Sequence, residues 1–283
     1  AANSVLQCLA WLMLLADGFH FDLWHGGFIL MSSLVQNSAI PLDLLTFGPF
    51  EWLLTGDWSI ERFRQRQQDA CEFCSYFLNF TKPGFLDCSW DTKPSFTDGL
   101  HALQLAGEKG TVFTPIVLPF IDVTADTCEL QHLVIHWHDA PGLCRAATQD
   151  GYQLVLELNR HNDDDHQKVT QLIHFSLSIT FPFFCNSFGE ISMETFVICG
   201  VVYHLGVTPS TGHWRAALKY QGHWLMYDDA CVPERVVQLP EHVHRNCLLV
   251  WLVRDTPHNA RTMNHGDLPF PKTGSAEASN RTE

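Results

Sequence analysis

The spacing of apolar residues changes along the chain, from helical periodicity in the first third to strand-like runs later. Residues 3–16 are apolar nearly all round, which predicts a helix buried in a core. A second apolar run covers residues 28–35, and apolar positions recur at helical spacing from Cys71 to Leu78. Residues 1–80 are therefore expected to be mostly helical.

Beyond Gly110 the apolar residues gather in runs rich in β-branched and aromatic side chains, the composition typical of strands. One short helix is expected at residues 128–137. The order of elements, helices first and antiparallel sheet afterwards, predicts an α+β domain with two lobes. After Arg254 the sequence is rich in Pro, Gly, Asn, Ser and Thr, which predicts a disordered tail over residues 255–283. The expected strands are 112–120, 152–158, 169–179, 196–205, 236–237 and 248–253.

A hairpin near the end of the chain carries the first candidate chemistry. A four-residue loop at 219–222 would place His213 directly opposite Asp228, with Cβ atoms about 5 Å apart. A two-residue loop at 221–222 would place the same two residues on the diagonal of one face. Asp229 would point to the other face unless the loop length is odd. With either even loop, an imidazole and a carboxylate lie side by side, as in the base-and-orienter pair of a nucleophile triad.

Composition narrows the class of protein. Among the 283 residues, 46% are hydrophobic and 12% aromatic, which is ample for a packed core. The net charge of −14 argues against a nucleic-acid partner. Ten scattered cysteines indicate reduced thiols in a cytoplasmic or nuclear protein rather than a disulfide scaffold. No apolar stretch is long enough to span a membrane, so no membrane partner is expected.

Four short motifs follow one another along the chain: Asn3-Ser4-Val5-Leu6-Gln7, then Gln67-Gln68-Asp69, then Leu158-Asn159-Arg160, and finally Gly212-His213-Trp214 with Trp224-Leu225-Met226-Tyr227-Asp228-Asp229. In this order they resemble the ubiquitin-specific proteases, papain-like cysteine proteases that cleave after the C-terminal glycine of ubiquitin. The resemblance covers residues 1–253, with His161 where the family has phenylalanine. It implies a papain-like fold with a helical thumb over 1–95 and an antiparallel β palm with reduced fingers over 96–254.

The resemblance leaves the nucleophile unassigned. In the family the cysteine lies three residues before the asparagine of the first motif, and here that position falls just before Ala1. The chain as written is therefore expected not to hydrolyse ubiquitin conjugates. Cys8 lies two turns along an apolar helix, where burial disfavours a thiolate, and is expected to be a core residue.

The resemblance also implies roles for the hairpin residues. His213 matches the general base, and Asp228 matches the residue that orients its imidazole. Asp229 is either a helper or a solvated turn residue. Trp214 replaces the tyrosine beside the histidine and is expected to wall the narrow channel for the Gly-Gly end of the substrate.

The second motif matches the box that lines the channel for the ubiquitin tail. That tail carries arginines, and the carboxylates of Asp69 and Glu72 can accept charge-assisted hydrogen bonds from them, beside Gln67. The alternative is an ordinary helix start, with Asp69 as the N-cap. The two roles are compatible, because they use different lone pairs.

No metal or cofactor is expected. Cys71 and Cys74 have a zinc-like spacing, but they lie on a predicted helix and have no second pair. His132, His136 and His138 include an i, i+4 pair, but no glutamate lies between them, and a surface face is favoured. The predicted function is thiol-dependent deubiquitination. The alternatives are a non-catalytic ubiquitin-binding scaffold and, more distantly, a zinc-binding regulatory module at His132.

Overall fold

The computed structural model describes the central and C-terminal parts of the chain, and the helices predicted before Asp69 lie outside the residues described, as does the tail beyond Asp255. The described ranges are 69–81, 90–94, 120–123, 129–140, 143–148, 153–160, 168–185, 190–208, 211–220, 222–228 and 233–255.

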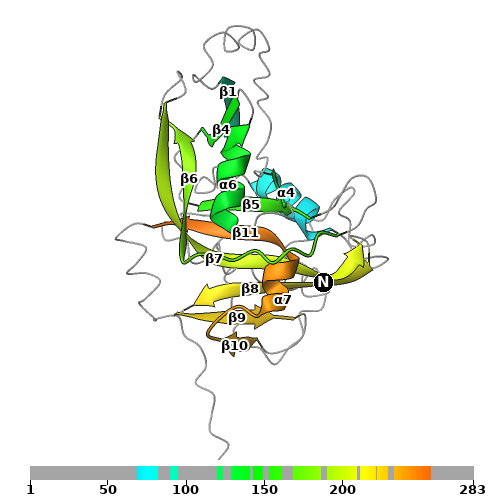
Figure 1. Ribbon diagram of the computed structural model, residues 1–283. Helices are drawn as coiled ribbons and strands as arrows, with labels where there is room; N and C mark the ends of the chain where they lie inside the picture. The colour runs from blue at the N-terminus through cyan, green and yellow to red at the C-terminus, as the bar shows by residue number, and fades with distance from the viewer. Residues whose placement is uncertain are drawn as a thin grey trace, which may run out of the picture.

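These residues are mostly strand, in an 11-stranded sheet with few helices (Figure 1). This β-rich character is more pronounced than the predicted α+β class suggests. The main path runs through β1 (Trp90–Pro94), β4 (Leu143–Ala147), β6 (Ser178–Phe184), β7 (Ile191–Thr208), β11 (Cys247–Arg254), β5 (Gln153–Asn159) and β2 (Phe120–Asp122). Off this path lie β3 (Asp139–Ala140), β8 (Thr211–Tyr220), β9 (His223–Tyr227) and β10 (Glu234–Val236).

The long strand β7 organises the sheet. Along one edge it pairs first with β6, over residues 191–197, and then with β8, over residues 200–208. Along the other edge it pairs with β11, over residues 196–203. Seven consecutive residues of β7, from Ile198 to His204, are buried, as expected for a strand that is covered on both faces. The hairpin of β8 and β9 is thereby attached to the centre of the core.

Two helices cover the part of the sheet around β5 and β6. Helix α4 (Ala70–Thr81) buries Phe73 and Cys74. Helix α6 (Leu130–His138) confirms the helix predicted at 128–137. Its Trp137 packs against Trp90 of β1 and Phe181 of β6, with ring centroids 5.5 and 5.3 Å away. Within the described ranges, no helix combines the length and hydrophobicity needed to cross a membrane.

The boundary of the helical thumb at residue 95 stays a prediction. The five residues just before it form β1, a strand paired with β4. The strands predicted at 152–158, 196–205 and 248–253 correspond to β5, β7 and β11. The described segment 168–177 differs from the strand predicted at 169–179, because it contains only isolated bridges and β6 begins at Ser178.

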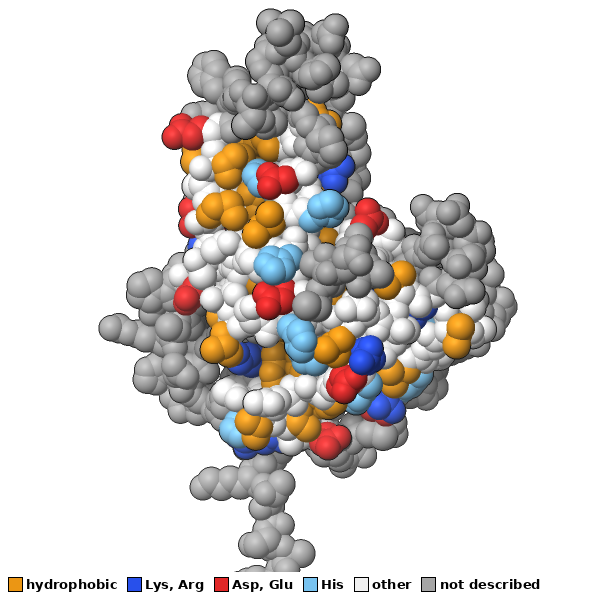
Figure 2. Space-filling view, in the orientation of Figure 1, with side chains coloured by type: hydrophobic (Ala, Val, Ile, Leu, Met, Phe, Trp, Pro, Cys, Tyr) orange, Lys and Arg blue, Asp and Glu red, His pale blue; other side chains and the backbone are white. Residues whose placement is uncertain are grey.

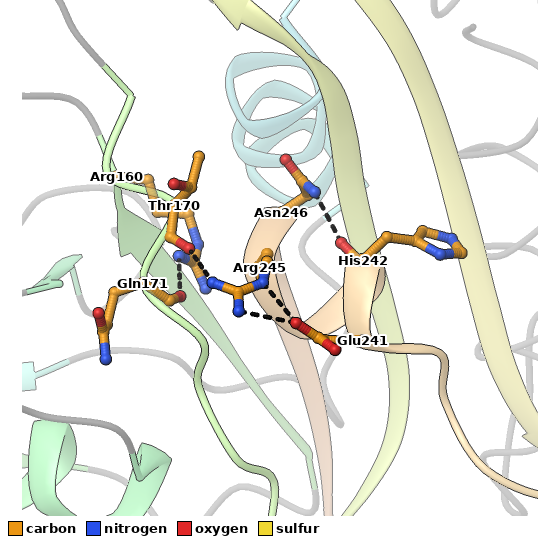
Figure 3. A network of polar contacts seen from close by, with 7 residues as sticks. All are labelled: Arg160, Thr170, Gln171, Glu241, His242, Arg245 and Asn246. Carbon is orange, nitrogen blue, oxygen red and sulfur yellow. Dashed lines mark hydrogen bonds and ion pairs between the residues drawn. The ribbon is translucent and has the colours of Figure 1, made fainter.

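The buried Arg160 explains why that segment is not a strand. Its guanidinium donates to the carbonyl oxygens of Val169 and Gln171, at 3.0 and 2.8 Å, so a side chain takes the place of a neighbouring strand. It also donates to Cys247 and to His244 of α7 (Glu241–Asn246), both at 2.7 Å. Figure 3 shows this guanidinium beside the α7 network.

Helix α7 is held to the same segment from its other side. Arg245 pairs with Glu241 one turn earlier, at 2.7 Å, and donates to the carbonyl of Thr170 at 3.2 Å (Figure 3). Asn246 donates to the carbonyl of His242 at 2.7 Å. The first and last of these contacts lie within α7, and the contact with Thr170 holds the helix to the segment 168–177. The helix lies in front of β7 and β8 (Figure 1).

Candidate active site

The register of the β8–β9 hairpin decides between the two predicted loops. Ala216 pairs with Tyr227, and the ladder continues to Tyr220 opposite His223, so the loop has two residues. Gly222, the second of them, has φ 75°, a conformation that glycine adopts without steric cost. The four-residue loop is therefore wrong, and the diagonal arrangement holds.

His213 and Asp228 meet on that diagonal. The distance between His213 Nε2 and Asp228 Oδ1 is 2.5 Å, and both side chains remain about one third exposed, at 36% and 31%. Because the carboxylate accepts only from a protonated nitrogen, this contact places the imidazole proton on Nε2 and leaves Nδ1 as the basic nitrogen. Asp229 lies outside the described residues.

The glycine before His213 is required by close packing. Gly212 has φ 147°, and a Cβ at this position would lie 2.5 Å from the carbonyl oxygen of Leu205 and 2.6 Å from His204 Nε2. The neighbouring Gly206 leaves space for the same imidazole, since its Cβ would lie 2.6 Å from His204 Cε1. The start of β8 can therefore approach β7 only with glycine at residue 212.

Trp214 points away from His213, as strand alternation requires. Its side chain is 1% exposed, and its ring lies 4.6 Å from that of the fully buried His204. The structure gives this residue a packing role. Its predicted contact with a substrate channel is not supported by this position.

Arg215 is a member of the site that the sequence reasoning missed. One of its guanidinium nitrogens lies 2.5 Å from Asp228 Oδ2, the carboxylate oxygen that His213 does not use. Arg215 also bonds to Tyr203 of β7, which lies directly opposite it in the ladder. The available signal was parity, because residues 213 and 215 must share a face of β8.

A second group of acidic side chains lies at the start of α4. Asp69 caps this helix as predicted, since its Oδ1 accepts from the amides of Cys71 and Glu72 at 2.7 and 3.3 Å. Sequence reasoning missed Glu157 of β5. Burial raises the pKa of Glu157 to about 7, and the charges of Asp69 and Glu72 add to the effect. Gln67 lies outside the described residues.

No protein-family model and no curated protein matches the sequence, so the comparison with known proteins rests on solved structures. The chain resembles the SAGA deubiquitinating module of Ubp8, Sgf11, Sus1 and Sgf73 bound to ubiquitin aldehyde, with TM-score 0.55 and 16% identity over 89% of this chain and 67% of the other. A second structure holds a cysteine-to-alanine variant of Ubp8 bound to monoubiquitin; its TM-score is 0.55 and its identity 17%, over 89% and 66%. A third structure, of the yeast module with a variant Sgf73, has TM-score 0.53 and 14% identity. The match covers 89% of this chain and 64% of the other.

The chain has the fold of a ubiquitin-specific protease domain. At 14–17% identity the likeness concerns the fold, and the chain spans about two thirds of the length of the chains it matches.

Within this ubiquitin-specific protease fold, two of the buried cysteines among the described residues, Cys71 and Cys247, are unsuited to act as nucleophiles. Burial raises the pKa of Cys71 well above its usual value, and it raises that of Cys247 to about 12. A nucleophilic thiol needs the opposite shift, toward the thiolate. Cys8 lies outside the described residues, so its expected place in a core stays a prediction.

The histidines of α6 do not assemble a metal site in the part of the chain that the structure describes. His132 and His136 are exposed, and His138 Nδ1 lies 2.6 Å from the carbonyl oxygen of Arg145. Histidine side chains are spread over the face that α6 occupies (Figure 2). No group of three or more metal-binding side chains occurs among the described residues.

Proposed function

We propose that this ubiquitin-specific protease fold carries a thiol-dependent deubiquitinase site, which hydrolyses the peptide or isopeptide bond after the C-terminal glycine of ubiquitin. The observation that carries the proposal is the His213–Asp228 pair, at 2.5 Å, on the hairpin that this fold joins to its central strand. The partners are ubiquitin and ubiquitinated proteins of the cytoplasm or nucleus.

The geometry supports the following proton path. His213 Nδ1 takes the proton from the cysteine thiol, whose sulfur attacks the glycine carbonyl. The C–N bond breaks as Nδ1 gives this proton to the leaving amine, and a thioester remains. Water then attacks the thioester and gives a proton to Nδ1. The C–S bond breaks, and Nδ1 returns its proton to sulfur. The carboxylic acid formed on ubiquitin loses the second proton of the water to solvent and leaves as the carboxylate. Asp228 stabilises the imidazolium at each transfer.

Recognition of the substrate tail is assigned to the carboxylates at the start of α4. Asp69 Oδ1 accepts the two hydrogen bonds that cap the helix, and its second carboxylate oxygen can accept from a guanidinium. Glu72 is exposed one turn later, and Glu157 lies close enough to both for their charges to raise its pKa. An arginine placed here would relieve the repulsion among the three, which supports binding of the basic ubiquitin tail.

Cleavage of a fluorogenic ubiquitin C-terminal conjugate tests the proposal. In a longer chain whose residue before Ala1 is cysteine, we expect turnover, and His213→Ala should reduce it about a hundredfold or more because the general base is lost. His132→Ala on α6 is the matched control and should leave turnover unchanged. Ubiquitin binding without turnover in this longer chain would indicate a non-catalytic scaffold instead.

A further inference from the structure

We propose that Arg215 is a positioning residue, which fixes the carboxylate of Asp228 so that its other oxygen holds the His213 imidazole in the orientation needed for catalysis. The inference deepens the proposed function and rests on it for the catalytic meaning of His213. The contact between Arg215 and Asp228 is a separate structural claim that can be tested without any substrate.

The strand register builds a row of three side chains across the sheet. Tyr203 of β7 lies opposite Arg215 of β8. Because Ala216 pairs with Tyr227, the next position outward places Arg215 opposite Asp228. Directly opposed side chains on one face are the nearest neighbours in a sheet. Arg215 therefore contacts Asp228 from the directly opposite position on β8, whereas His213 contacts it from the diagonal position two residues away.

The two contacts to Asp228 divide its oxygens. Arg215 takes Oδ2 and His213 Nε2 takes Oδ1, each at 2.5 Å. A carboxylate with one contact can rotate about its Cβ–Cγ bond, while one with two fixed contacts cannot. With Oδ2 held by a guanidinium, Oδ1 stays aimed at Nε2, and the imidazole keeps its proton there.

Arg215 is itself held from behind. It bonds to the hydroxyl of Tyr203, which is 1% exposed and lies under α7, where the His242 ring is 5.7 Å from the Tyr203 ring. The charged and titratable groups around the row are Glu234 of β10 and His242 of α7. A guanidinium bonded to a buried tyrosine is a firmer support for a partly exposed carboxylate than an arginine that is fully in solvent.

The ratio of the Nε2–H and Nδ1–H tautomers of His213 reports on this positioning directly. In the 283-residue chain labelled with ¹⁵N-histidine, neutral His213 should carry its proton on Nε2. We expect Arg215→Met to raise the population of the Nδ1–H tautomer about tenfold, which corresponds to weakening a charge-assisted bond by about 1.4 kcal/mol. Arg215→Lys keeps a cation and should restore the Nε2–H tautomer. Backbone amide shifts of β7 to β9 verify the fold, and Arg215→Gln replaces the methionine variant if that variant does not fold.

The control is Arg235→Met on β10, whose guanidinium contacts His223 at 2.9 Å and not Asp228. It should leave the His213 tautomer unchanged. An unchanged tautomer in a folded Arg215→Met or Arg215→Gln variant would overturn the proposal, as would an equal change in Arg235→Met. If instead the tautomer depends on Arg215 but the longer chain neither binds nor cleaves ubiquitin conjugates, the proposed function fails and the contact stands.

Discussion

Replacing Glu157 with glutamine tests the electrostatics at the start of α4. Burial and the charges of Asp69 and Glu72 raise the pKa of Glu157 from 4.5 to about 7. The folded state therefore holds a proton on Glu157 between pH 4.5 and 7, where the unfolded chain has released it. Because the folded state binds more protons in this window, stability falls as the pH rises through it, and the full cost is present above pH 7.

The shift sets an upper bound on this cost. A change from 4.5 to about 7 is about 2.5 pKa units, and each unit corresponds to about 1.36 kcal/mol, which gives about 3 kcal/mol. Relaxation and solvent around the carboxylate reduce the figure, so a gain of about 1–3 kcal/mol is expected for Glu157→Gln at pH 8. At pH 4 both side chains are neutral, and the two proteins should be nearly equal in stability.

Urea unfolding followed by circular dichroism at pH 4, 6 and 8 provides the measurement. The free-energy difference between variant and parent should grow with pH and level off above pH 7. Glu129→Gln, at an exposed position, is the matched control and should show no such growth. A difference for Glu157→Gln that is the same at pH 4 and pH 8 would refute the electrostatic argument.

Three further substitutions test the packing of the fold. Gly212→Ala should destabilise the protein by about 3 kcal/mol or more, since strained φ costs about 1–3 kcal/mol and the new Cβ also meets the Leu205 carbonyl at 2.5 Å. Gly222→Ala, with nothing within 4 Å of its Cβ, should cost only the strain. Arg160→Met should lower the free energy of unfolding by about 3–5 kcal/mol, because it leaves several carbonyls unpaired. Urea unfolding measures all three, and an equal effect of Arg235→Met would contradict the argument for Arg160.

The local part of the site was predictable, because it depends on strand parity. Any even loop places His213 and Asp228 on one face, so the pair was expected before the loop length was known. The length itself was not predictable, since residues 219 and 220 suit either a strand end or a loop. The helix cap at Asp69 was also predictable, because its hydrogen bonds involve only the backbone amides of residues close to it in sequence.

The missing parts of the site depend on contacts between distant segments. Glu157 sits in an apolar strand-like run, and only the packing of α4 near β5 brings it close to Asp69. The segment 168–177 has strand-like composition, yet it takes its hydrogen bonds from Arg160, which no local pattern indicates. In both cases the deciding partner lies across the fold.

The alternation of β8 separates chemistry from packing within four consecutive residues. His213 and Arg215 face Asp228, while Gly212 and Trp214 face the buried ring of His204. A substitution at 212 or 214 should therefore change stability first, and one at 213 or 215 should change the imidazole first. The same separation explains how the partly exposed base stays in place. The buried face of β8 supplies the rigidity, and the contacts of Asp228 with Arg215 and His213 hold the imidazole against this rigid strand.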